Sequence, residues 1–352
     1  MHKGDETLLT GKERLERIFH HEEVDRPACI CPGGMMNMIT TDLMDVSGIT
    51  WPEAHTDAEM MAKLALASYE NGCFENVGVP FCMTIEAEGL GAEVTMGTKI
   101  YEPHVTAYAI DTVMDWKKLS PINIESGRAK VVIDAIKILK SMNLDVPIVG
   151  NIVGPVSTAS SVIEPVNFYK ELRKKNAIAH EYMTFVPEET IKFARAMIEA
   201  GADVIAISDP SGTGEILGPK YFEEFAVKYL NMLLDGLQEE KMGTIVHICG
   251  QMKSVYNQID MVRADALSFD SVVPMKEARK NLGEDRVLMG NVSTYALEFG
   301  DPARVASITK HCVESGSNII SPACGLGTKS PLANIQTMLQ TLEQEKGLDI
   351  CQ

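Results

Sequence analysis

The sequence predicts an α/β protein with the fold of a parallel (β/α)8 (TIM) barrel, for three reasons. Short apolar runs that end in glycine or a polar residue recur along the chain. Most of these runs are separated by stretches of helix length with one apolar face. The 352 residues contain no internal repeat and no linker-like segment that would mark a domain boundary. We therefore expect a single barrel domain over residues 1–352 rather than a doubly wound sheet.

The predicted strands are short, apolar and rich in β-branched residues, as expected when both faces of a parallel strand are buried. They are 28–31 (ACIC), 75–80 (ENVGVP), 146–151 (VPIVGN), 203–208 (DVIAIS), 244–249 (TIVHIC), 266–270 (ALSFD), 286–291 (RVLMGN) and 318–323 (NIISPA). Eight strands that alternate with helices are the number a closed barrel requires.

The predicted helices show apolar residues three and four positions apart. Examples are 60–72, 189–202, 219–240 and 301–316. The last of these begins with Asp301 and Pro302, a typical cap and first-turn pair. Each such helix would return the chain to the start of the next strand.

The segment 82–145 is too long for one crossover between strands. It contains 92–97 (AEVTMG) and 105–110 (VTAYAI), which alternate like an antiparallel hairpin. We expect an inserted β-hairpin near the barrel mouth. Glu86 and Glu88, which precede this hairpin, are expected to be surface charges.

Composition limits the classes of partner. The chain has 49 acidic and 32 basic residues and a net charge of −17, which argues against nucleic acid and anionic membranes. It has no run of 18 apolar residues, and its start (MHKGDETLLTGKERLERIF) is polar, so we expect a cytoplasmic protein. In that setting eight cysteines are free thiols or metal ligands rather than disulfides.

Polar residues at the carboxyl ends of barrel strands are the first candidates for chemistry, because active sites of this fold are built there. The candidates are Asn151, Asp209, His247, Cys249, Asp270, Asn291 and Cys324.

Three of these candidates form a predicted metal site. His247 and Cys249 are two residues apart in one strand, so both side chains point to the same face. Cys324 follows the eighth strand, and closure of the barrel brings the ends of strands five and eight toward one axis. One imidazole and two thiolates favour zinc and leave a coordination position open. Packing of a buried histidine and two cysteines is the alternative. Cys29 and Cys31 form a second C-x-C pair, without a third ligand nearby.

The chain resembles the uroporphyrinogen decarboxylase superfamily and, within it, the zinc-dependent corrinoid methyltransferases of the methylcobamide:coenzyme M type. The resemblance covers nearly the whole chain, including GKERLERIFHHEEVDRPA, WPEAHTDAEMMAKLALASYE, GAEVTMGTK, VPIVGNIVGP, AGADVIAISDP, VHICG, GNVS, ACGLG and PLANI. It implies that His247, Cys249 and Cys324 bind Zn2+. It also implies that a corrinoid (cobalamin) arrives on a separate protein, since the chain has no D-x-H-x-x-G motif.

The decarboxylase branch fits this chain less well. Those enzymes bind a tetrapyrrole with several carboxylates through early arginines, whereas no arginine occurs here between Arg26 and Arg128. Asp209, in SDPSGTG, is either a pocket acid of the decarboxylase kind or a residue that hydrogen-bonds its own loop.

The resemblance leaves the substrate open. Either a small thiol such as coenzyme M accepts the methyl group, or a methyl ether donates it, as in anaerobic O-demethylation. The apolar segment 33–38 (GGMMNM) is consistent with the second case, or with ordinary packing at the barrel mouth. Two further alternatives are a decarboxylase and a zinc-binding or corrinoid-partner-binding protein without catalysis.

The other candidates receive supporting roles. The family places an acid where Asp270 stands, so this residue is expected to be a fourth zinc ligand that substrate displaces, or a hydrogen-bonding neighbour of the ligands. Asn151 and Asn291 are expected to orient the substrate or the corrinoid edge, or simply to stabilise the turns in which they lie.

Overall fold

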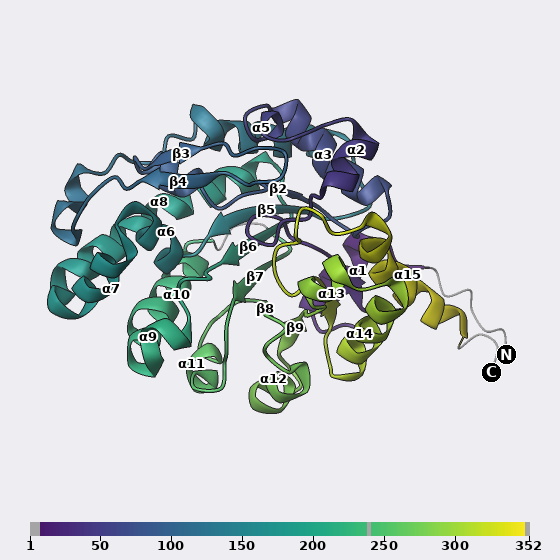
Figure 1. Cartoon of the computed structure of the whole chain (residues 1–352). Helices are drawn as coiled ribbons and strands as arrows, with labels where there is room; N and C mark the ends of the chain where they lie inside the picture. The colour runs from purple at the N-terminus through teal and green to yellow at the C-terminus, as the bar shows by residue number, and fades with distance from the viewer. Residues whose placement is uncertain (1–7, 238–240, 349–352) are drawn as a thin grey trace.

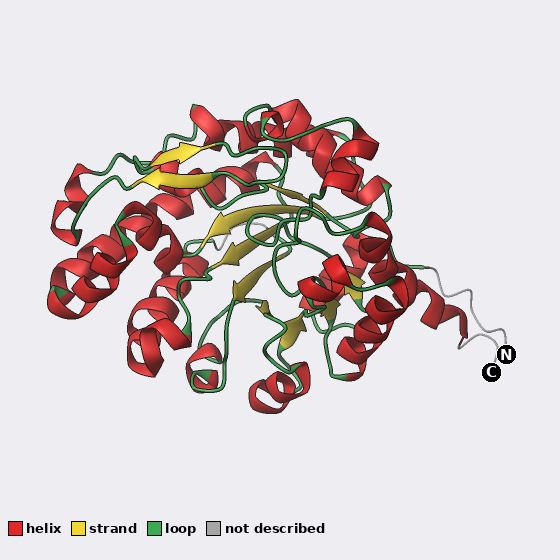
Figure 2. Cartoon of the chain, in the orientation of Figure 1, coloured by secondary structure: helices red, strands yellow, loops and turns green. Residues whose placement is uncertain are grey.

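A computed structural model describes residues 8–237 and 241–348. Eight parallel strands form one curled sheet at the centre, and helices surround it (Figures 1 and 2). These strands are β1 (Ala28–Cys29), β2 (Val77–Val79), β5 (Ile148–Val153), β6 (Val204–Ser208), β7 (Gly243–Ile248), β8 (Ala266–Phe269), β9 (Val287–Met289) and β10 (Ile319–Ile320). Each overlaps a predicted strand and extends at most two residues beyond it, as β5 does, so the barrel prediction is confirmed.

The helices mostly follow strands and lie outside the sheet (Figure 2). The α-helices are α1 (Gly11–Phe19), α2 (Thr41–Ser47), α3 (Ala58–Glu70), α4 (Ile85–Gly89), α5 (Gly127–Ser141), α6 (Pro155–Val162), α7 (Pro165–Lys174), α8 (Asn176–Ala200), α9 (Gly214–Tyr221), α10 (Lys228–Asp235), α11 (Tyr256–Ile259), α12 (Met275–Leu282), α13 (Thr294–Phe299), α14 (Pro302–Glu314) and α15 (Leu332–Leu348). Shorter helical turns are η1 (Glu53–His55), η2 (Val113–Lys118) and η3 (Phe222–Val227).

The strands neighbour one another in the order β1-β10-β9-β8-β7-β6-β5-β2. The first and last strands of this order, β1 and β2, are joined by hydrogen bonds of the backbone and of one side chain. The Glu75 N–H donates to the Cys29 carbonyl at 2.8 Å. The Asn76 side chain accepts from the Cys31 N–H at 2.9 Å and donates to the Cys31 carbonyl at 2.8 Å. A side-chain amide thus replaces part of the strand ladder where the barrel closes.

The predicted start of the helix at 301–316 is confirmed. Asp301 precedes α14, and its carboxylate accepts a hydrogen bond from the Arg304 N–H at 2.8 Å. Pro302 occupies the first turn, where its missing N–H costs no helical hydrogen bond.

The helix predicted over 219–240 is confirmed over residues 219–235, although it is not a regular α-helix throughout. Gly218, with a φ of 69°, breaks α9 immediately before Pro219, and the π-helical turn η3 then joins the end of α9 to α10. Pro219 thus stands at the start of the helical segment, where its missing N–H costs no helical hydrogen bond. Residues 238–240, the end of the predicted helix, lie outside the described residues.

The predicted hairpin is confirmed as β3 (Glu93–Thr95) and β4 (His104–Ala107), an antiparallel pair separate from the barrel sheet (Figure 2). The segment that joins the two strands reaches the loop after β10, where the Thr328 hydroxyl donates to the Ile100 carbonyl at 3.3 Å. Among the helices of residues 8–237 and 241–348, none has the length and apolarity needed to cross a bilayer.

Candidate metal centre

His247, Cys249 and Cys324 converge at the carboxyl ends of the strands. His247 lies near the end of β7 and Cys249 directly after it, while Cys324 lies in the loop after β10. The His247 Nε2 is 3.3 Å from the Cys249 sulfur, which is 3.9 Å from the Cys324 sulfur. All three donor atoms lie within 4.8 Å of one another. The predicted convergence across 75 residues is therefore present in the fold.

These separations fit a tetrahedral ion. With metal–sulfur bonds of about 2.3 Å and metal–nitrogen bonds of about 2.0 Å, two sulfurs lie roughly 3.8 Å apart and a nitrogen and a sulfur roughly 3.6 Å apart. The observed 3.9 and 3.3 Å are close to both values. His247 is 1% exposed, whereas Cys249 and Cys324 are half-buried. The side of the site that the two sulfurs form therefore faces the barrel mouth.

The two thiols influence each other's ionisation. The hydrogen bond from Cys249, with a further contribution from His247, lowers the pKa of Cys324 to about 5. The same hydrogen bond and burial raise the pKa of Cys249. At neutral pH the pair therefore holds a thiolate beside an imidazole, which suits a soft divalent cation.

The loop that carries Cys324 is held close to the loop after β1. Gly325 lies against the Met35 carbonyl, and a Cβ at this glycine would stand 2.4 Å from that oxygen. The Leu326 N–H donates to the Asn37 carbonyl at 2.9 Å. The glycine noted in ACGLG is therefore required for a close backbone approach.

Asp270 follows β8 beside this centre. The register pairs Ile248 with Phe269, so Asp270 lies next to Cys249 on the adjacent strand. Its Oδ1 accepts from the Val272 N–H and the Ser271 hydroxyl, both at 3.2 Å, and its charge contributes to the raised pKa of Cys249. Asp270 does not belong to the group of three donors. Its role as a ligand remains a prediction.

Asp209 is fully buried at the end of β6 and binds the start of α6. Its Oδ1 accepts from the Ser157 N–H at 2.7 Å and the Ser157 hydroxyl at 2.6 Å, and its Oδ2 accepts from the Val156 N–H at 3.2 Å. Burial raises the pKa of Asp209, while these hydrogen bonds oppose the shift. Of the two expected roles, the geometry matches the stabilisation of a loop and a helix start.

Asn151 and Asn291 both make structural contacts. The Asn151 side chain, on β5, donates to the Pro32 carbonyl at 2.5 Å and to the Val79 carbonyl at 3.2 Å. The Asn291 side chain, after β9, donates to the carbonyls of Asp270 and Val273, both at 2.8 Å. These bonds match the turn-stabilising alternative. An orienting role toward substrate or corrinoid remains a prediction.

Sequence reasoning misplaced Glu86. This residue is 2% exposed, and its carboxylate accepts from the Val153 N–H at 2.8 Å. Burial raises the pKa of Glu86 to about 7. Glu88 is half-buried and pairs with Arg128 at 2.6 Å. The surface prediction is therefore wrong for Glu86, whose carboxylate binds the end of β5, whereas the Glu88 side chain is still 36% exposed.

Two residues that sequence reasoning missed lie behind His247. Ser268, on β8, is 2.9 Å from the His247 Nδ1, and its hydroxyl is 3.9 Å from the Met36 sulfur. Strand alternation places Ser268 on the face of Asp270, whereas the contacts of Ser268 with His247 and Met36 depend on packing between strands and loops. The rival pair Cys29 and Cys31 is fully buried and does not belong to the donor group.

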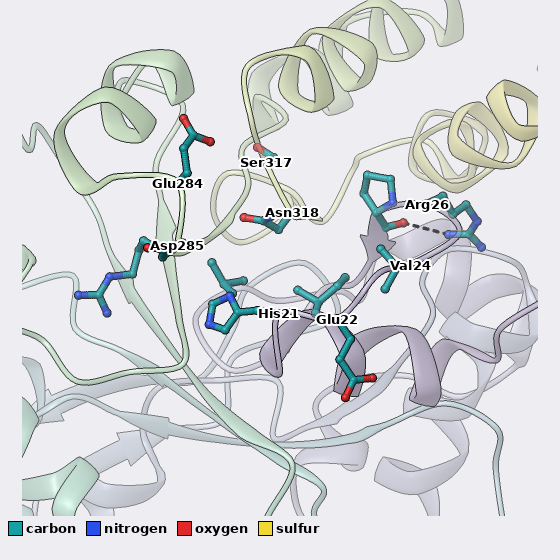
Figure 3. A pocket seen from close by; sticks show the side chains of 12 residues that line it. His21, Glu22, Val24, Arg26, Glu284, Asp285, Ser317 and Asn318 are labelled. Atoms are coloured by element: carbon teal, nitrogen blue, oxygen red, sulfur yellow. Dashed lines mark hydrogen bonds between the residues drawn. The ribbon is translucent and has the colours of Figure 1, made fainter.

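A separate cavity of about 420 Å³ opens at the other end of the barrel (Figure 3). Its lining includes His21, Glu22, Arg26, Asp285 and Asn318, which precede or begin strands β1, β9 and β10. Arg26 is already paired with Glu75 at 2.7 Å. This cavity lies at the amino ends of the strands, where barrel enzymes do not place their chemistry.

The fold and the donor set define the class of the protein: a (β/α)8 barrel with a candidate metal centre at the carboxyl ends of its strands. More specifically, the chain belongs to the uroporphyrinogen decarboxylase (URO-D) family, which it matches over residues 10–344.

Several methyltransferases are similar to this chain over most of its length. The chain is 33% identical over 342 residues to the methylcobamide:CoM methyltransferase MtbA of Methanosarcina acetivorans, with 97% of this chain and 99% of that protein covered. It is 28% identical over 318 residues to a methylated-thiol–coenzyme M methyltransferase of Methanosarcina mazei, with 89% and 84% covered. The solved structure of a methyltransferase from Methanosarcina mazei matches with a TM-score of 0.87 and 32% identity, covering 96% and 99%.

Proposed function

We propose that this protein is a zinc-dependent methyltransferase that moves a methyl group between the cobalt of a protein-bound corrinoid and the sulfur of a small thiol. The observation that carries the proposal is the convergence of His247 Nε2 and the sulfurs of Cys249 and Cys324 within 4.8 Å. Relatives that cover nearly the whole chain and act on methylcobamide and CoM support the same reaction.

Zinc is the proposed metal because one imidazole and two thiolates are a soft donor set that prefers it. When bound, zinc supplies Lewis acidity, which lowers the pKa of a coordinated thiol enough to yield a thiolate at neutral pH. His247, Cys249 and Cys324 would hold the ion with three donors, and the substrate sulfur would be the fourth. The half-burial of both cysteines supports an approach of the corrinoid partner from the barrel mouth.

Two further residues of the chain, Met36 and Asp270, contribute to the proposed site. The loop after β1 brings Met36, which is 1% exposed, to within 3.9 Å of Ser268 beside the metal ligands. Asp270 contributes a carboxylate next to Cys249, and we propose it as a resting-state ligand or hydrogen-bonding neighbour that gives way to substrate. We propose a cytoplasmic setting, as the sequence predicts, in which the corrinoid protein binds transiently.

A methyl ether donor is the second candidate. It is favoured by the buried Met36 of the loop after β1, whose sulfur is 3.9 Å from the hydroxyl of Ser268, a neighbour of His247. A decarboxylase of tetrapyrroles is less consistent with the site. Arg26 is paired with Glu75, and Arg128 is buried against Glu88 and Thr84, so neither is available to bind substrate carboxylates at the mouth.

Metal analysis followed by a methyl-transfer assay tests the proposal. The purified protein should contain about one zinc per chain. It should demethylate free methylcobalamin in the presence of a thiol, as seen in the cobalt absorption spectrum. Activity should disappear with a chelator and return with zinc.

The alternatives give different results. Methylation of cob(I)alamin by an aryl methyl ether, without thiol-dependent demethylation, would select the ether donor. Carbon dioxide release from a carboxylated tetrapyrrole without cobalt would select the decarboxylase. A cobalt spectrum unchanged over many equivalents of every substrate would leave only a binding protein, and undiminished transfer by the metal-stripped enzyme would overturn the role of zinc.

A further inference from the structure

Ser268 connects the candidate metal-binding histidine to the methionine loop. It lies on β8, opposite His247 in the parallel register with β7, and is fully buried. Its hydroxyl oxygen is 2.9 Å from His247 Nδ1, and the same hydroxyl donates to the Met36 sulfur over 3.9 Å. A neutral imidazole that binds a metal through Nε2 carries its proton on Nδ1, which must find an acceptor.

The two neighbours of Ser268 determine the direction of these hydrogen bonds. A hydroxyl has one proton and two lone pairs, so it can donate to Met36 while it accepts the Nδ1–H of His247. A thioether sulfur can only accept, so the Ser268 hydroxyl must be the donor in its contact with Met36, and the serine oxygen keeps its lone pairs for the His247 Nδ1–H. With the opposite direction, the Nε2 proton would point toward the Cys249 sulfur 3.3 Å away, and the nitrogen could not bind an ion.

The Met36 sulfur is held in place by its own loop. The Met36 carbonyl accepts from the Cys31 thiol at 3.0 Å and from the Gly33 N–H at 3.2 Å. Met36 is 1% exposed, so its side chain has little freedom to leave Ser268. The loop after β1 therefore reaches His247 through the hydroxyl group of Ser268.

We propose that Ser268 is a positioning residue that holds His247 in the tautomer whose Nε2 binds the metal, with Met36 directing the Ser268 hydroxyl. This inference rests on the metal centre of the proposed function. It assigns to the loop after β1 a part in metal affinity that is separate from any contact with substrate.

The test is the zinc dissociation constant, measured by chelator competition on purified Ser268→Ala, Ser268→Thr and Met36→Leu proteins. Ser268→Ala should bind zinc roughly 10–100-fold more weakly than wild type, as for other hydrogen-bond partners of metal-binding histidines. Ser268→Thr keeps the hydroxyl and should recover most of the affinity. Met36→Leu should show a smaller loss than Ser268→Ala, because the acceptor for His247 remains.

Ser208→Ala is the matched control, because Ser208 lies opposite His247 on the β6 side of the same register and is also buried. Its zinc affinity should equal that of wild type. Cobalt(II) substitution adds a spectroscopic readout, since the ligand-field bands should change in Ser268→Ala and not in Ser208→Ala. Thermal melting of each apo-protein separates a loss of fold from a loss of metal.

Two results would overturn the inference. One is equal zinc affinity and equal cobalt spectra for Ser268→Ala and wild type. The other is the same loss in Ser268→Thr as in Ser268→Ala, which would assign the effect to packing. Unchanged affinity in Met36→Leu would remove Met36 from the arrangement. If wild type itself binds no zinc, the proposed function fails rather than this inference alone.

Discussion

The sulfur atoms of Cys249 and Cys324 lie 3.9 Å apart although 75 residues separate them in the chain. This distance is about that between two ligands of one tetrahedral ion and far longer than the roughly 2.05 Å of a disulfide. The strands β7 and β10 that carry the two cysteines are separated in the sheet by β8 and β9. Only the curvature of the sheet brings their carboxyl ends together.

Replacement of either cysteine should abolish tight zinc binding. Cys324→Ser and Cys249→Ser each leave two of the three ligands, so we expect zinc affinity to fall by about 100-fold or more and methyl transfer to disappear. Zinc content after dialysis against a weak chelator measures the effect. Cys73→Ser, at a buried cysteine outside the donor group, is the control and should retain zinc. Retention of zinc by both ligand variants would contradict the assignment.

Asp270→Asn should reveal whether this carboxylate binds zinc at rest. If it does, the zinc X-ray absorption spectrum of the variant should differ from wild type without thiol. The two spectra should then become alike once a thiol is bound, because substrate sulfur displaces the carboxylate. Identical spectra in the absence of thiol would restrict Asp270 to a hydrogen-bonding role.

Asp209→Ala should destabilise the fold without affecting the metal. The substitution leaves the N–H groups of Val156 and Ser157 and the Ser157 hydroxyl without their acceptor in a fully buried position. We expect a loss of roughly 2–4 kcal/mol in the free energy of unfolding, measured with urea. Asp209→Asn should lose less. An unchanged urea midpoint together with lost methyl transfer would instead indicate a catalytic role.

Glu86 should make stability depend on pH. Burial raises the pKa of Glu86 from 4.5 to about 7 in the folded protein, so folding favours its protonated form. The resulting stabilisation is fully present below about pH 4.5 and is lost as the pH rises through about 7. Relative to wild type, Glu86→Gln should therefore gain up to about 3 kcal/mol of unfolding free energy between pH 4.5 and 8. Urea unfolding of both proteins at several pH values measures this difference, and parallel curves would contradict it.

Much of the architecture could be predicted because it depends on local patterns. Runs such as 146–151 and 203–208 are apolar on both faces, and only a parallel strand covered on both sides buries them. The metal centre could be predicted for a related reason. The spacing of His247 and Cys249 sets their common direction, and the barrel rule brings the loop of Cys324 to the same end.

The sequence by itself determined the eight strands, their parallel direction and the three donor residues, because these follow from side-chain periodicity over a few positions. Tertiary structure alone decided that Glu86 is buried, that Asp209 binds the start of α6 and that Ser268 and Met36 stand behind His247. Each of these facts depends on which side chains approach across distant strands and loops. That approach is set by the packing of the closed barrel, and no local pattern encodes it.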